Sequence, residues 1–156
     1  METPLRILVA EDEINDVLLL QRAFAGAKVK APVYFAHDGQ EVMDYMEGKP
    51  PFDNPVDFPL PNLLLLDLKL PRVNGFEVLE WLRGHPRLNR LLVVVCSESG
   101  EAADVTRAYS LGANAYIFKP REPEELVRII ERLQNYWRNI QTEPDQVLPM
   151  PSLMAG

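Results

Sequence analysis

Five short apolar runs, separated by segments with helical spacing, constrain the fold of this chain more than any other feature. The runs are RILVA (6–10), PVYFA (32–36), NLLLL (62–66), LLVVVC (91–96) and AYIF (115–118). Each has the length of a strand and is almost continuously apolar, which is typical of strands that are buried on both faces of a parallel sheet. A β-sandwich would need strands without helices between them.

The segments between these runs carry apolar residues at intervals of three and four, as one face of a helix requires. They predict helices from Ile14 to Gly26, over 41–47, from Phe76 through Leu82, from Val105 to about Gly112, and over 123–140. Strands that alternate with helices predict an α/β fold. We expect a doubly wound, five-stranded parallel sheet, (βα)5, with right-handed crossovers and helices on both faces.

The domain organisation follows from the proline content. Residues 1–140 are predicted to form one domain, and its segment 48–61 (GKPPFDNPVDFPLP) holds five of the fourteen prolines. This insert is predicted to be a stiff, extended surface loop. Residues 141–156 contain prolines and no periodicity, so they are predicted to be disordered unless a partner orders them.

Composition excludes several classes of protein. The formal net charge of −7 argues against nucleic-acid binding, which needs clustered Lys and Arg. No apolar run approaches the ~20 residues of a membrane span, and no signal segment opens the chain, so no membrane contact is expected. Cys96 is the single cysteine, which rules out an internal disulfide. We therefore expect a cytoplasmic protein.

Charged and hydroxyl side chains follow four of the five predicted strands. Glu11 and Asp12 follow the first, Asp67 the third, Ser97 the fourth and Lys119 the fifth. Because the carboxyl ends of parallel strands meet at one edge of a sheet, we expect these side chains to converge there. Asp67 is expected to lie at the rim, just past the buried leucines, and not in the interior.

Converging carboxylates repel one another unless a cation lies between them. Carboxylate oxygens are ligands that Mg²⁺ prefers, so this edge is a predicted Mg²⁺ site. A carboxylate beside Mg²⁺ and a lysine is also a workable nucleophile for a phosphoryl group. The edge is therefore predicted to form an aspartyl-phosphate.

Four motifs, in this order, resemble the receiver domains of two-component response regulators: ILVAEDE, LLLLDLKLPRVNGFEVL, VVVCSES and GANAYIFKP. The resemblance covers residues 5–138 and implies a flavodoxin-like fold and a histidine kinase as phosphoryl donor. It implies these roles: Asp67 as phosphoacceptor, Glu11 and Asp12 as an acidic pair that binds Mg²⁺ with Asp67, Ser97 as switch hydroxyl, Lys119 as the lysine that contacts the phosphoryl group, and Tyr116 as an aromatic residue that changes rotamer. It also implies that Gly75 forms the turn into the third helix and that the Lys119–Pro120 peptide is cis.

Within this family the chain is most similar to the stand-alone regulators of phytochrome-type histidine kinases. The proline-rich insert, the LGANAYI and KP pairing, and the extended aromatic last helix carry this similarity. The chain departs from the usual family pattern at Cys96, Ser97 and Glu98. Ser97 keeps the hydroxyl, whereas Glu98 adds a negative charge beside the predicted phosphoryl site.

Three functions stay open at this point. The first is a single-domain response regulator, in which phosphorylated Asp67 switches a surface toward an unknown downstream protein or phosphotransfer partner, because we expect no output domain after residue 140. The second is a constitutive interaction module without phosphorylation. The third is an aspartyl-phosphate hydrolase, which generally needs an acid two residues after the nucleophile; this chain has Lys69 there.

Several candidates also have an ordinary structural reading. Glu11 and Asp12 could be helix N-terminal acids, Ser97 a helix N-cap and Tyr116 a core-edge aromatic residue. Each reading is reasonable for its residue alone. The combination of these residues with Asp67 and Lys119 favours the functional interpretation.

The last predicted helix is longer than the short strands require, at roughly 27 Å for a rise of ~1.5 Å per residue. Its apolar stripe continues through Trp137 and Ile140. We expect another chain or the tail to cover these two residues. The pattern predicts a homodimer that uses the last strand and the last helix.

Overall fold

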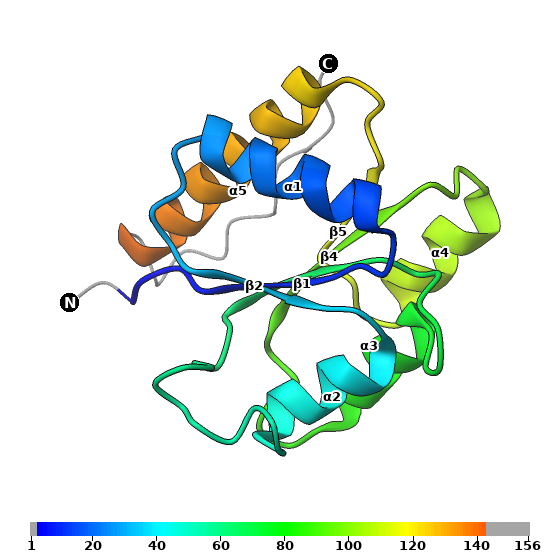
Figure 1. Ribbon diagram of the computed structural model, residues 1–156. Coiled ribbons are helices and arrows are strands. Elements are labelled where there is room, and N and C mark those ends of the chain that lie inside the picture. Colours follow the sequence, from blue (N-terminus) through cyan, green and yellow to red (C-terminus); the bar gives the residue numbers. More distant parts are fainter. Residues whose placement is uncertain (1–2, 143–156) are drawn as a thin grey trace.

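The structure is a computed structural model that describes residues 3–142 of the 156-residue chain. Its strands are β1 (Ile7–Ala10), β2 (Val33–Ala36), β3 (Leu63–Leu66), β4 (Leu92–Ser97) and β5 (Ala115–Phe118). Its helices are α1 (Ile14–Gly26), α2 (Gly39–Glu47), α3 (Gly75–Gly84), α4 (Ala102–Ser110) and α5 (Pro123–Thr142). Every predicted strand and helix is present, and their order is the predicted alternation (Figure 1).

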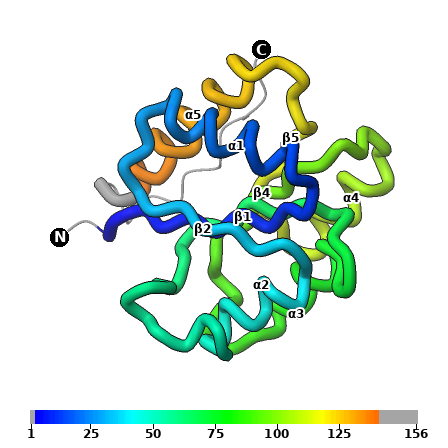
Figure 2. The backbone as a smooth tube through the Cα atoms, in the orientation of Figure 1, coloured from blue at the N-terminus to red at the C-terminus, as the bar shows by residue number. Residues whose placement is uncertain are grey.

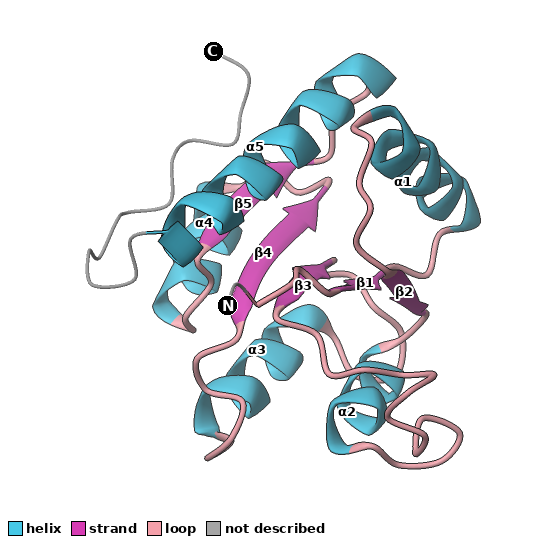
Figure 3. Cartoon of the chain, turned by 90° about the vertical axis from the view of Figure 1, so that its left-hand side faces the viewer, coloured by secondary structure: helices cyan, strands magenta, loops and turns pink. Residues whose placement is uncertain are grey.

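The five strands form one parallel sheet in the order β2-β1-β3-β4-β5. Helices α1 and α5 cover one face, and α2, α3 and α4 cover the other, as Figures 1 and 3 show from two directions. The predicted doubly wound (βα)5 fold is therefore confirmed. The strand order reverses between β1 and β3, and sheets of this kind bind ligands beyond the carboxyl ends of the strands at such a reversal.

Alternate residues of each strand serve different hydrophobic cores. In β3, Leu63 and Leu65 pack under α1 and α5, whereas Leu64 and Leu66 pack against α2 and α3. All four are buried. A run of four leucines is explained because side chains point alternately to the two faces of a strand, and both faces are covered here.

The proline-rich insert lies between α2 and β3, as predicted, but it is anchored by aromatic side chains. Phe52 and Phe58 pack edge-on with ring centroids 5.2 Å apart. Both rings also contact Tyr45 of α2, whose hydroxyl donates a hydrogen bond to the carbonyl of Pro59 at 2.9 Å. The insert is therefore folded back on α2 through turns, as the tube in Figure 2 shows, and is not simply extended.

One peptide-bond prediction is wrong. In residues 3–142 the cis peptide is Pro50–Pro51, and the Lys119–Pro120 bond is not cis. Proline makes the cis form accessible, but trans remains the preferred isomer of most X–Pro bonds.

The end of α5 is covered differently from our expectation. Trp137 packs at the edge of the α1/α5 core, and its indole N–H donates to the carbonyl of Thr3 at 3.1 Å. The segment before β1 thus covers part of the stripe that we assigned to another chain or to the tail. Helix α5 ends at Thr142, two residues into the predicted tail, and the rest of that tail lies outside the described residues. No helix within residues 3–142 combines the length and the apolar character that crossing a bilayer requires.

Candidate functional site

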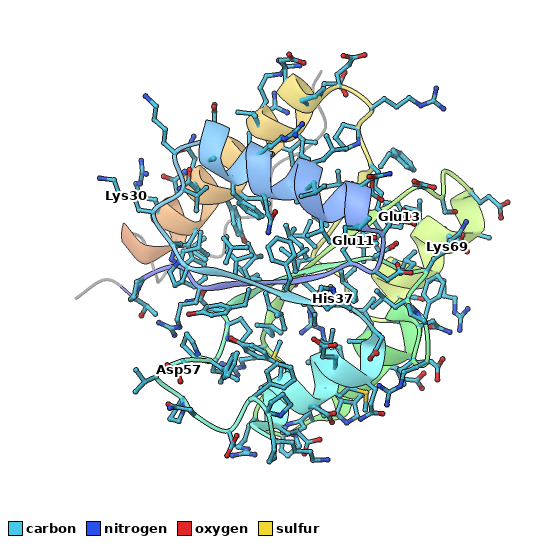
Figure 4. The ribbon with its side chains drawn as sticks, in the orientation of Figure 1. Glu11, Glu13, Lys30, His37, Asp57 and Lys69 are labelled. Atoms are coloured by element: carbon cyan, nitrogen blue, oxygen red, sulfur yellow. The ribbon has the colours of Figure 1, made fainter. Side chains whose placement is uncertain are left out.

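The predicted site residues meet at the edge of the sheet where the strands end. Glu11 and Asp67 directly follow β1 and β3, whose last residues pair in the sheet. Figure 4 shows Glu11 and Glu13 at this edge with Lys69 nearby, whereas Lys30 and Asp57 lie toward the opposite edge. The fold therefore brings the acids of the N-terminal motif to the end of the central strand.

Lys119 is the centre of the site. Its ammonium nitrogen lies 2.7 Å from Glu11 Oε2, 2.9 Å from Asp16 Oδ2 and 3.2 Å from Asp67 Oδ2. The lysine side chain is 14 % exposed, so water screens these ion pairs only weakly. One cation thus neutralises part of the charge of three carboxylates that belong to distant parts of the chain.

Asp67 lies at the rim directly after β3, as expected, but it is buried, so our expectation that it would not lie in the interior was wrong. Its exposed fraction is 5 %, and that of Glu11 is 2 %. Asp67 Oδ2 pairs with Lys119, and Oδ1 accepts the backbone N–H of Lys69 at 3.3 Å. A carboxylate is tolerated in such a place when its oxygens are paired and hydrogen-bonded.

The pKa values of Glu11 and Lys119 are both raised, which favours the neutral form of Glu11 and the charged form of Lys119. Burial, opposed by the hydrogen bond from Lys119 and aided by the negative charge of Asp67, raises the pKa of Glu11 to about 7. Burial acts to lower the pKa of Lys119, but hydrogen bonds to Glu11 and Asp16 outweigh it and raise that pKa above its ordinary value. At neutral pH Lys119 therefore keeps its charge, and Glu11 can release a proton when a cation enters.

Three carboxylates are grouped as a cation would require. Oxygen atoms of Glu11, Asp12 and Asp67 all lie within 4.8 Å of one another. Asp12 is exposed, so a partly hydrated ion has access from solvent. Oxygen donors and access to water are what Mg²⁺ prefers, and the residues therefore fit this ion.

A pocket of about 180 Å³ opens beside these groups. It is lined by Glu11, Asp12, Glu13, Asp16, Asp67, Lys69, Glu98 and Lys119. Six of these side chains are carboxylates and two are lysines, so the pocket carries an excess of negative charge. An anion such as a phosphoryl group needs an added cation to enter it.

Ser97 and Tyr116 lie on the opposite face of the sheet from Lys119. Tyr116 packs in the core formed by α2, α3 and α4, whereas its neighbour Ile117 packs under α1 and α5. Ser97 is fully buried and does not line the acidic pocket. Its Oγ accepts the backbone N–H of Ser99 at 3.2 Å, a bond that leaves the hydroxyl proton available.

Sequence reasoning missed Asp16 and Ser99. Asp16 lies in the first turn of α1 and pairs with Lys119. Ser99 accepts a 2.9 Å hydrogen bond from the Tyr116 hydroxyl through its carbonyl. Asp16 could have been found from its position in the first helical turn after β1. No sequence pattern predicts the hydrogen bond between Tyr116 and Ser99.

Cys96 and Glu98 differ in exposure although both flank Ser97. Burial raises the pKa of the Cys96 thiol to about 12, and this side chain packs in the core under α1 and α5 as a small apolar residue. Glu98 is exposed and faces the acidic pocket. The added negative charge that we expected beside the site is thus present.

Gly75 forms a close backbone contact with the site. A Cβ at this position would lie 2.4 Å from the Asp67 carbonyl oxygen and 2.7 Å from Leu68 Cα. Gly75→Ala is therefore expected to lower the free energy of unfolding by about 3 kcal/mol, because backbone atoms must move to relieve the overlap. Urea denaturation followed by circular dichroism measures this change.

Gly84, at the other end of α3, supplies the matched control. A Cβ there meets nothing within 4 Å. Gly84→Ala is expected to be neutral or to stabilise by about 0.5 kcal/mol, since alanine loses less backbone entropy in a helix. Equal effects of the two substitutions would contradict the role given to the Gly75 contact.

Comparison with known proteins places the chain among signalling regulators. Residues 7–131 match the family described as the response regulator receiver domain. The chain is 36 % identical to the probable methanogenesis regulatory protein FilR2 of Methanothrix harundinacea, over 87 % of this chain and 85 % of that protein. It is 32 % identical to response regulator Rcp1 of Synechocystis, over 90 % of this chain and 94 % of Rcp1.

Solved structures agree with this result. Response regulator RPA3017, from red light signalling of R. palustris, superposes with a TM-score of 0.82 at 39 % identity, over 88 % of this chain and 95 % of that one. The phosphorylated cyanobacterial phytochrome response regulator RcpA gives 0.78 at 34 % identity, over 87 % and 95 %. The Mn²⁺-bound form of Rcp1 gives 0.76 at 29 % identity, over 96 % and 100 %. The predicted similarity to stand-alone phytochrome regulators is thereby confirmed.

Proposed function

The chain belongs to the response regulator receiver domain family, and on that premise we propose that it accepts a phosphoryl group on Asp67 from a histidine kinase and thereby switches a protein-interaction surface. The observation that carries this proposal is the contact of the Lys119 ammonium with Asp67 and Glu11 inside the acidic pocket. A buried carboxylate with a fixed cation on one oxygen is suited to attack phosphorus and to hold the product.

The transfer itself needs little covalent chemistry from the protein. An Asp67 carboxylate oxygen forms a bond to phosphorus while the P–N bond of the kinase phosphohistidine breaks, and the electron pair returns to the imidazole nitrogen. Lys119 places its positive charge beside the acyl phosphate that results. Glu11, Asp12 and Asp67 would hold Mg²⁺, which when bound supplies positive charge to the phosphoryl oxygens.

Ser97 and Tyr116 are proposed to transmit the phosphorylation of Asp67 to the protein-interaction surface. The Ser97 hydroxyl proton is available for a phosphoryl oxygen, while its Oγ accepts the Ser99 N–H. Tyr116 already lies inward, 8 % exposed, with its hydroxyl bonded to the Ser99 carbonyl. Both side chains lie on the α4 side of the sheet, so we place the switched surface at α4 and β5.

The partners are proposed from the relatives. RcpA is called a phytochrome response regulator and RPA3017 belongs to red light signalling, so a phytochrome-type kinase is the proposed donor, in the cytoplasm. The downstream protein is not identified by this similarity. The homodimer through β5 and α5 stays a prediction: Phe118 at the end of β5 is 39 % exposed, which supports it, whereas the cover that Thr3 gives to Trp137 weakens it.

Incubation with acetyl phosphate and Mg²⁺ tests the proposal. We expect the chain to take up a single phosphate that is stable in acid and labile in base, as an acyl phosphate is. Chelation of the metal with EDTA should prevent the uptake, because the pocket then keeps its excess negative charge. Mass spectrometry of the intact protein measures it.

Two other results would each support a rival function. No uptake from acetyl phosphate or from any histidine kinase would favour the constitutive interaction module. Rapid multiple turnover of the donor would favour a hydrolase, although the pocket offers Lys69 where a hydrolase needs an acid. Other members of this family act as signalling regulators, which supports the first function.

A further inference from the structure

Ser99 occupies a junction between the proposed switch residues. Its backbone N–H donates to Ser97 Oγ at 3.2 Å, and its carbonyl accepts the Tyr116 hydroxyl at 2.9 Å. Any displacement of Ser97 Oγ or of the Tyr116 ring therefore acts on the backbone of Ser99. Both of these bonds involve main-chain atoms, so they do not depend on the side chain at position 99.

The Ser99 side chain joins this backbone to α4. Its hydroxyl donates to Asp104 Oδ2 at 2.5 Å and accepts the Glu101 N–H at 3.4 Å. Asp104 belongs to the first turn of α4, and Glu101, the N-cap residue, makes no side-chain cap bond of its own. The Ser99 hydroxyl thus accepts the N–H of the N-cap residue and holds Asp104, so it joins the first turn of α4 to the loop after β4.

Helix α4 depends on such polar contacts because little of it is buried. Of its nine residues only Ala108 is buried, and Tyr109 is 48 % exposed. Helices with few buried apolar contacts are among the parts of a protein that move most easily. The position of the first turn of α4 is therefore sensitive to a single side-chain bond.

The segment after α4 is held firmly. The Arg83 guanidinium donates to the Gly112 carbonyl through Nε at 3.0 Å and through Nη2 at 2.7 Å. It also donates to the Leu91 carbonyl at 2.8 Å, just before β4. The segment after α4 is thus tied to α3 and to the residue before β4, and the first turn of α4 is joined to the switch residues through Ser99 and Asp104.

We propose that Ser99 and Asp104 are positioning residues that transmit phosphorylation from Ser97 and Tyr116 to the first turn of α4. The inference rests on the proposed phosphorylation of Asp67 and names the route by which that site moves an interaction surface. When Ser97 Oγ turns toward a phosphoryl oxygen, the acceptor of the Ser99 N–H moves. Asp104 then follows the Ser99 hydroxyl, and α4 shifts at its start while its end stays fixed.

Hydrogen–deuterium exchange of α4 backbone amides, with and without acetyl phosphate and Mg²⁺, tests this route. Phosphate uptake is measured on the same samples. In the wild type we expect phosphorylation to change exchange at Asp104 and Val105. In Ser99→Ala and in Asp104→Ala, uptake should persist and this change should be lost. The double variant should match Ser99→Ala, because that substitution already removes the bond to Asp104.

Two further variants separate transmission from general destabilisation. Ser99→Thr keeps the hydroxyl and should restore the response. Ser110→Ala removes a hydroxyl that donates to the Arg107 carbonyl at 2.9 Å, at the other end of α4, and should leave the response intact.

Three outcomes would overturn the inference. A wild-type α4 response in both Ser99→Ala and Asp104→Ala, with normal uptake, refutes the route and leaves the proposed function standing. Loss of uptake in both variants also refutes it, because the route lies after the chemistry. Absence of uptake in the wild type refutes the proposed function and the inference together.

Discussion

Asp67→Asn is expected to abolish phosphate uptake from acetyl phosphate and Mg²⁺. The amide oxygen is a much weaker nucleophile than a carboxylate oxygen, and an acyl phosphate cannot form on it. Asparagine keeps the size of the side chain, and its oxygen can still accept the Lys69 N–H, so the fold should persist. Intact-protein mass spectrometry measures the phosphate, and circular dichroism checks the fold.

Asp16→Asn is the matched control for this substitution. Asp16 also lines the pocket and also pairs with Lys119, at 2.9 Å. It lies on α1, however, and is not part of the carboxylate group formed by Glu11, Asp12 and Asp67. We expect Asp16→Asn to take up phosphate as the wild type does. If uptake survived in Asp67→Asn but failed in Asp16→Asn, the phosphoacceptor would be Asp16 and not Asp67.

Lys119→Met is expected to lower the free energy of unfolding of the metal-free protein by about 3 kcal/mol. The substitution removes the ammonium group that contacts Glu11, Asp16 and Asp67. Because both acids are buried, Asp67 would keep an unpaired charge with little screening, and Glu11 would take up a proton and lose its bond to the ammonium group. Urea denaturation at neutral pH, in the presence of EDTA, measures the loss.

Two further measurements, with added Mg²⁺ and with a second lysine substituted, separate the effect of the buried ion pairs from that of net charge. Added Mg²⁺ should recover part of the lost stability, since the ion would supply positive charge to the same carboxylates. Lys69→Met removes the other lysine that lines the pocket, but Lys69 is exposed and its backbone makes the bond to Asp67. We expect that control to change stability by less than about 0.5 kcal/mol. A loss as large as that of Lys119→Met would show that net charge, and not the buried contact, is responsible.

Most of the site could be predicted because it follows from the ends of strands. The positions of Glu11, Asp12, Asp67 and Lys119 depend only on where apolar runs stop, and parallel strands bring those ends to one edge. The separation of Tyr116 from Lys119 could also have been derived, since successive side chains of a strand point to alternate faces and these residues are three positions apart. Ser99 could not be found in this way, because its partners come from β4, β5 and α4 and leave no pattern in the sequence.

The type and order of the helices and strands follow from the sequence alone, because apolar runs and helical spacing are local properties of the chain. The run of four leucines before Asp67 likewise identifies a buried strand. The folded chain is needed to see that Asp67 is buried and that Lys119 contacts Asp16 as well as Asp67. The same holds for the segment before β1, which covers part of Trp137 through Thr3. Burial and ion pairing depend on which distant segments the fold brings together, and local spacing does not carry that information.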